Sequence, residues 1–202
     1  MNVPLPGHRA PAVGTEVPLE MLAACHERVD QQCRTLQRLA AHLAAHGTDT
    51  QAREAAGAVM RYFDTAAPHH HDDEEVDLFP ALIEAMAGSD AVCIRDLTAA
   101  LTHEHRQLEQ LWRALRAVLE QVAAGAPTRL DGGDVDAFVG LYARHIAREE
   151  GELLPMAGRL LSNEQLDRIG QAMRMRRGIA STEPGAAVST NSVSPAASPR
   201  ST

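Results

Sequence analysis

Two stretches of the sequence place a histidine and a glutamate four residues apart, ahead of an apolar pair and a proline. In the first, His70 precedes Glu74, and in the second, His145 precedes Glu149. Each motif continues in the same order, with a second glutamate, two residues, a leucine, an apolar residue and a proline. Residues four apart share one face of a helix, and imidazole and carboxylate groups both bind metals. The repeated pattern therefore predicts a duplicated metal-binding device.

Single histidines, His26 and His105, occupy positions in two other periodic segments where a hydrophobic residue would be expected. Each half of the chain thus supplies one histidine from its first segment and a His-Glu pair from its second. A lone histidine on such a face is more often a hydrogen-bonded core residue than a ligand, and a His-Glu pair can simply share a hydrogen bond. The combination of one histidine on each of four segments favours a metal site.

Apolar residues at alternating spacings of three and four predict the helices that must position these groups. The predicted segments are 18–46, 50–79, 89–124 and 135–156. We expect Pro68 to kink the second segment and Pro80 to break it after Phe79. A capping box at Ser162 predicts a short fifth helix that ends near residue 177.

The composition supports an all-α fold, because Leu and Ala supply much of the apolar content and aromatic residues make up only 3%. Two helical hairpins predict an up-down-up-down four-helix bundle over residues 16–177 with a short C-terminal helix. Residues 1–15 are expected to form a flexible arm. Residues 178–202 are Ser-, Pro- and Ala-rich and are expected to be disordered.

The predicted bundle turns six polar residues inward. They are His26, His70, Glu74, His105, His145 and Glu149. Isolated buried carboxylates would cost several kcal/mol each unless a cation offsets them. The set fits a dinuclear transition-metal site, with iron as the leading choice and the two carboxylates as candidate bridges.

Two alternatives to this ligand set remain open. A shift of one residue would exchange His70 and Glu74 for His71 and Glu75, although both motifs place proline at the same distance after the histidine, which argues against the shift. Glu150 could also serve in place of its neighbour. His69 and His71 are expected to be surface residues or neighbours of the ligands.

Charge and composition exclude several classes of function. The formal net charge is -8 and no basic stripe follows any helical face, which argues against nucleic-acid binding. All basic residues are arginines, so lysine Schiff-base chemistry and a P-loop are excluded. No apolar run approaches membrane-spanning length, and an odd number of cysteines favours a reduced, cytoplasmic protein.

At these residues the sequence resembles the hemerythrin family, specifically the hemerythrin-like HHE cation-binding domain. The resemblance covers roughly residues 18–160 and rests on His26, the two His-x3-Glu motifs and Glu104-His105. It implies a non-haem di-iron centre with an oxo or hydroxo bridge that meets O2 or related molecules. Oxygen-carrying hemerythrins have a further histidine one turn before the third-helix ligand, where this sequence has Leu101. That departure implies a more open iron.

These features together lead to three hypotheses about function. The first is a di-iron protein that binds O2, NO or peroxide for sensing, storage or detoxification. The second is an enzyme with the same centre and catalase-like or peroxidase activity. The third is a metal-dependent interaction module that contacts a partner through residues 174–177 or the tails. A ferritin-like oxidase is disfavoured because the sequence contains no Glu-x-x-His spacing.

Overall fold

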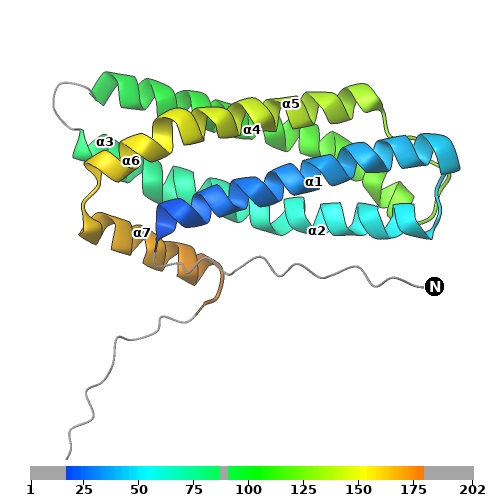
Figure 1. The fold of residues 1–202 in the computed structure, drawn as a ribbon, viewed down its shortest axis with the longest axis horizontal. Coiled ribbons are helices and arrows are strands. Elements are labelled where there is room, and N and C mark those ends of the chain that lie inside the picture. The colour runs from blue at the N-terminus through cyan, green and yellow to red at the C-terminus, as the bar shows by residue number, and fades with distance from the viewer. Residues whose placement is uncertain (1–16, 87–90, 180–202) are drawn as a thin grey trace, which may run out of the picture.

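The computed structural model describes residues 17–86 and 91–179 and is a bundle of four long helices (Figure 1). The helices are α1 (Pro18–His46), α2 (Thr50–Asp72), α4 (Ala91–Ala123) and α5 (Gly132–Arg148). Both α1 and α4 pack against α2 and α5. The described residues contain no strand. The predicted all-α bundle is therefore confirmed, whereas the arm over 1–15 and nearly all of the tail over 178–202 lie outside the described residues.

The ends of the helices follow the signals that the sequence carries. Pro18 stands in the first turn of α1, where its missing N–H leaves no bond unmade. Gly47 ends that helix with φ of 73°, a conformation that glycine adopts without steric cost. The side chain of Asp49 caps α2 by accepting a hydrogen bond from the N–H of Ala52. Ser162 and Gln165 form the predicted capping box at the start of α7 (Asn163–Arg176).

The second helix does not break where the sequence led us to expect. It runs through Pro68 and continues past residue 72 as the π-helix η1 (Asp73–Leu78) and then α3 (Phe79–Ala85). The fourth helix does the same, through η2 (Glu149–Leu153) into α6 (Leu154–Leu160). Proline lacks an N–H and crowds the carbonyl four residues earlier, so a wide π-turn ahead of it keeps the helix continuous. The expected break after Phe79 was wrong.

A layer of buried polar residues divides the core into two apolar clusters. One cluster fills the bundle on the side of the α1–α2 connection and includes Phe63 and Phe138. The other includes Leu22, Leu78 and Leu153 and lies toward α3, α6 and α7. Along each long helix and its continuation, the buried histidines and carboxylates fall between members of these two clusters. The apolar clusters therefore shield the polar layer from water on both sides.

Helix α7 packs beside η1 and the start of α1 at one end of the bundle (Figure 1). Its last turn and the following residue bring Arg176 and Arg177 to the carboxylate of Asp73, which is fully buried. Arg176 also pairs with Asp77 at 2.7 Å. These two arginines therefore serve the fold itself. None of the described helices combines the length and apolar character needed to cross a membrane.

Candidate metal centre

The structure brings all six predicted ligand residues together in the buried polar layer. The four histidines are at most 3% exposed, and the two glutamates are fully buried. Each of α1 and α4 contributes one histidine, while α2 with η1 and α5 with η2 each contribute a histidine and a glutamate. The assignment of these residues as metal ligands stays a prediction.

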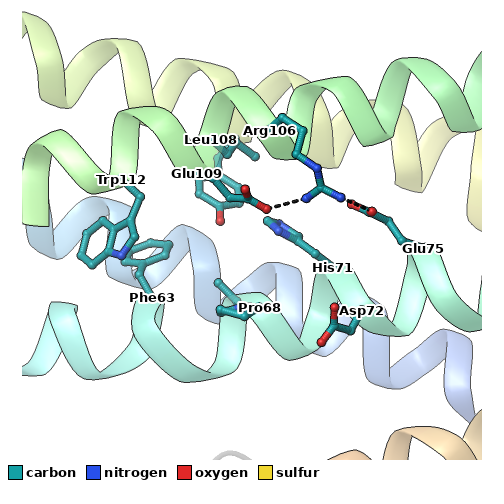
Figure 2. Close-up of a pocket in the computed structure, with 11 residues that line it drawn as sticks. Phe63, Pro68, His71, Asp72, Glu75, Arg106, Leu108, Glu109 and Trp112 are labelled. Carbon is teal, nitrogen blue, oxygen red and sulfur yellow. Dashed lines mark hydrogen bonds and ion pairs between the residues drawn. The ribbon is translucent and has the colours of Figure 1, made fainter.

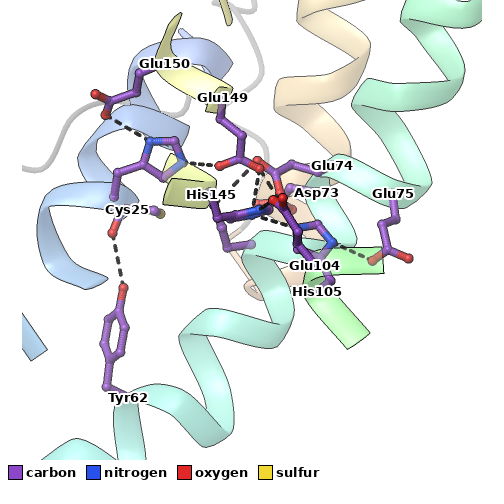
Figure 3. A network of polar contacts seen from close by, with 12 residues as sticks. Cys25, Tyr62, Asp73, Glu74, Glu75, Glu104, His105, His145, Glu149 and Glu150 are labelled. Atoms are coloured by element: carbon purple, nitrogen blue, oxygen red, sulfur yellow. Dashed lines mark hydrogen bonds and ion pairs between the residues drawn. The ribbon is translucent and has the colours of Figure 1, made fainter. Parts of the chain in front are cut away.

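Two buried carboxylates stand at the centre of the imidazoles (Figure 3). The oxygens of Glu149 lie 3.0 Å from Nε2 of His26 and 2.9 Å from Nε2 of His145. The oxygens of Glu74 lie 3.5 Å from Nε2 of His70 and 3.3 Å from Nε2 of His105. Each carboxylate thus reaches imidazoles from two different helices.

The neighbouring glutamates contact the same imidazoles from outside. Glu75 lies 2.6 Å from Nδ1 of His105, and Glu150 lies 3.0 Å from Nδ1 of His26. Both side chains reach solvent, with exposed fractions of 19% and 50%. The structure therefore separates Glu74 and Glu149, which are inside, from Glu75 and Glu150, which are outside.

A third outer carboxylate belongs to Glu104, which the sequence singled out only as the neighbour of His105. It lies 2.9 Å from Nδ1 of His145 and also pairs with Arg148 at 2.6 Å. Three of the four predicted imidazoles are thus held at Nδ1 by a carboxylate. Carboxylates in this position fix the orientation of metal-binding imidazoles and raise their basicity.

This arrangement directs acceptor atoms at one another in the centre of the layer. When Nδ1–H of His26 donates to Glu150, its Nε2 carries a lone pair that faces Glu149. When Nδ1–H of His105 donates to Glu75, the Nε2 atom of His105 likewise carries a lone pair, and it lies 3.0 Å from Nε2 of His145. The carboxylate oxygens of both inner glutamates also lack hydrogen-bond partners. Facing lone pairs in a buried site require protons or a cation between them, so the residues present fit a metal pair.

The electrostatics of the metal-free site favour neutral imidazoles beside a carboxyl group that keeps its proton. Burial lowers the pKa of His105 to about 3 and the pKa of His70 well below its usual value. Burial and the nearby Glu149 raise the pKa of Glu74 well above its ordinary range. Although burial opposes both shifts, the close approach of the Glu149 carboxylate to the His145 imidazole lowers the pKa of Glu149 and raises that of His145. The imidazoles of His70 and His105 are therefore neutral, the form that binds metal, and a bound metal would replace the proton that Glu74 otherwise keeps.

The π-helical turns place both inner carboxylates. Glu74 and Glu149 lie within or at the start of η1 and η2, and their carbonyls accept from the N–H groups of Phe79 and Leu154, five residues later. A π-turn is a frequent feature of functional sites because the extra residue shifts the side chains that follow it. The two proline-containing motifs thus produce the same local geometry in both halves.

Of the two expectations for His71, a surface residue or a neighbour of the ligands, the structure favours the second. Its ring is only 7% exposed and lies 3.9 Å, centroid to centroid, from that of His105. His69 is half-buried and belongs to no potential metal-binding group within the described ranges. Tyr142 packs on Phe63 in the apolar cluster and is a core residue.

Three overlapping sets of donor atoms emerge from this geometry, each with all its atoms within 4.8 Å of one another. The first comprises His26, His70, Glu74 and Glu149. The second comprises Glu74, His105, His145 and Glu149, and the third His71, His105 and His145. Two sets therefore share both inner carboxylates, which is the arrangement expected of a pair of metals with carboxylates between them.

A pocket of about 180 Å³ lies beside this centre, between α2 and α4 (Figure 2). Phe63, Pro68 and Trp112 form an apolar wall, and His71 lines the same pocket. Arg106, at the rim, pairs with Glu75 and Glu109. The pocket therefore leads from a charged rim to the buried imidazole of His71.

Comparison with known proteins places this geometry in a family. The sequence model described as "Hemerythrin HHE cation binding domain" matches residues 17–157. An uncharacterized protein of Haemophilus influenzae (strain ATCC 51907 / DSM 11121 / KW20 / Rd) is 36% identical over 160 residues, which cover 79% of this chain and 90% of that protein. The family match spans all six predicted ligands and both π-helical motifs.

Proposed function

We propose that this chain, which belongs to the hemerythrin family of HHE cation-binding domains, is a non-haem di-iron protein that binds O2, NO or peroxide. One iron would be held by His26 and His70 and the other by His105 and His145. Glu74 and Glu149 would lie between them. When bound, the iron pair would supply redox chemistry toward these small molecules.

The proposal rests on one observation. Acceptor atoms of imidazoles and carboxylates that lack hydrogen-bond partners point at one another in a buried layer. Three imidazoles are turned inward by outer carboxylates, and the oxygens of both inner glutamates lack hydrogen-bond partners. A mixed set of imidazoles and carboxylates suits iron better than a thiolate-preferring ion. The apolar clusters on either side limit access of water, which favours the binding of small, weakly polar molecules over that of hydrated ions.

We extend the proposal to sensing, storage or detoxification in a reducing, cytoplasmic setting. All three cysteines are free thiols, two of them buried. The pocket beside His71 offers a route of entry for a diatomic molecule or peroxide. Nothing in residues 17–86 and 91–179 indicates a particular protein partner.

Metal analysis with optical spectroscopy tests the proposal directly. Protein produced with iron, or reconstituted anaerobically with Fe2+, should contain about two irons per chain, and its near-ultraviolet and visible bands should change on exposure to O2 or NO. The His70→Ala and Glu149→Ala variants should lose iron and these bands. His69→Ala, which alters an adjacent imidazole outside the centre, is the control and should match the wild type.

Two results would contradict the proposal. One is the absence of bound iron after reconstitution of a folded wild-type protein. The other is an iron spectrum that the His70→Ala and Glu149→Ala variants leave unchanged. Steady turnover of peroxide by the haem-free protein would instead identify an enzyme with the same centre.

A further inference from the structure

His71 is a buried imidazole that the ligand set above does not use. Its Nε2 atom is buried and has no hydrogen-bond partner. A histidine in a protein core usually has its ring nitrogens satisfied, because an unpaired buried polar atom costs about 1–3 kcal/mol. The position of His71 therefore calls for a binding partner that the protein alone does not provide.

The surroundings of His71 indicate that this partner is a metal. Its ring stacks on that of His105 with an interplanar angle of 14°, and it meets the ring of His145 edge-on at 6.3 Å. Nitrogen atoms of these three rings lie within 4.8 Å of one another. Two nitrogens bound to one ion at about 2.1 Å can be as much as about 4.2 Å apart. A rotation of the His71 ring relative to that of His105, together with a closer approach of the nitrogens, would bring all three to one ion.

The two halves of the centre differ at this point. In the second motif the residue after His145 is Ile146, which packs against the apolar cluster. The position near His26 and His70 therefore has no third imidazole from the duplicated motif. Because His71 is present only on the side of His105 and His145, it makes the two metal positions chemically unequal.

We propose that His71 is a third imidazole ligand of the metal held by His105 and His145. This inference rests on the proposed di-iron function and deepens it. With the shared carboxylates, the His105 position would have five protein donors and the His26 position four. Because His71 also lines the 180 Å³ pocket between α2 and α4, it would place this metal at the inner end of the pocket.

Binding of Co2+ to the metal-free protein tests the inference without reliance on activity. The wild type should bind two Co2+ ions per chain, as measured by equilibrium titration and by the visible ligand-field bands. His71→Ala should lower the affinity for one of the two Co2+ ions by at least about tenfold and should change the bands of that ion. Loss of a residue that only hydrogen-bonds a ligand already lowers metal affinity by about this factor. The other ion should be unaffected. His69→Ala is the matched control and should bind both ions as the wild type does.

Rescue and combined variants separate ligation from packing. Because the ring of His71 borders an open pocket, added imidazole should restore the second Co2+ and its bands in His71→Ala. His71→Gln keeps a polar side chain of similar size and should show the same loss of affinity. In the His105→Ala background, His71→Ala should cause little further loss of Co2+ affinity. In the His70→Ala background, it should leave both ions bound with lowered affinity.

The outcomes distinguish failure of this inference from failure of the proposed function. If the folded wild type does not bind two ions, the proposed function is wrong, and this inference is wrong with it. If the wild type binds two ions and both His71 variants bind them with unchanged affinity and bands, His71 is not a ligand. Loss of both ions from folded variants without rescue by imidazole would show a packing role and would also overturn the inference.

Discussion

Nδ1 of His26 lies 3.0 Å from a carboxylate oxygen of Glu150, while Nε2 of the same ring points to the buried layer. The outer carboxylate thus determines which nitrogen of the imidazole is left with a lone pair for the centre. Glu75 and Glu104 act in the same way on His105 and His145. The site therefore has inner carboxylates that face each other and outer ones that orient imidazoles.

Inner and outer glutamates of the second motif should respond differently to the same substitution. We expect Glu149→Gln to lose at least one of the two irons, because it removes a carboxylate shared by both positions. Glu150→Gln should keep both irons with affinity lowered about 10–100-fold, because it only loosens the ring of His26. Equilibrium dialysis with metal analysis measures both. Glu152→Gln, an exposed neighbour, is the control, and full loss of iron from Glu150→Gln alone would contradict the assignment.

The metal-free protein should lose stability with rising pH through Glu74. Its pKa is raised in the folded state from 4.5, chiefly by burial and then by Glu149. The folded protein therefore keeps a proton that the unfolded chain releases above pH 4.5, so this contribution is complete at low pH and declines as the pH rises. The expected slope is at most about 1.4 kcal/mol per pH unit.

The Glu74→Gln variant isolates this effect, because glutamine has a similar shape and no charge. In EDTA, the free energy of unfolding of Glu74→Gln minus that of the wild type should increase from pH 5 to pH 8. Urea denaturation at each pH gives both values. A difference that stays constant over this range would show that Glu74 does not take up a proton in the folded, metal-free state.

The arginines at the end of α7, Arg176 and Arg177, should contribute strongly to stability, because they neutralise the fully buried Asp73. We expect the double change Arg176→Ala and Arg177→Ala to lower the free energy of unfolding by about 3–5 kcal/mol, the usual cost of an uncompensated buried charge. Adding Asp73→Asn should recover part of the loss. Arg34→Ala, whose partner Asp30 is 53% exposed, is the control and should cost under about 1 kcal/mol.

The apolar cluster around Phe63 should support the fold without taking part in metal binding. Its ring contacts those of Trp112, Phe138 and Tyr142 and is 3% exposed. Phe63→Ala should lower the free energy of unfolding by about 3–5 kcal/mol and leave the iron content of the folded protein unchanged. Thermal and chemical denaturation with metal analysis check this. Val92→Ala, at a 68% exposed position, should fall within about 0.5 kcal/mol of the wild type.

Much of the fold could be predicted from the sequence, because the periodic apolar residues of each helix identify the face that it turns toward the core. The apolar period located the four long segments, and the interruptions at His26 and His105 marked where the polar layer would lie. The equal spacing from histidine to proline selected His70 and Glu74 over their neighbours, and the structure places Glu74 inside and Glu75 outside. These conclusions depend on patterns along the chain and not on contacts between helices.

The contacts between helices were decided by the tertiary structure. His71 is rotated about 100° from His70 on an ideal helix, yet both are buried because α2 packs against two neighbouring helices, α1 and α4. Pairing of Glu104 with His145 likewise depends on the rotation of α4 relative to α5. The sequence by itself indicated the six predicted ligands, all of which lie in the polar layer, but not the burial of His71 beside them. Which of them meet was set by helix rotation and by the π-turns, because each turn adds a residue that the regular period does not contain.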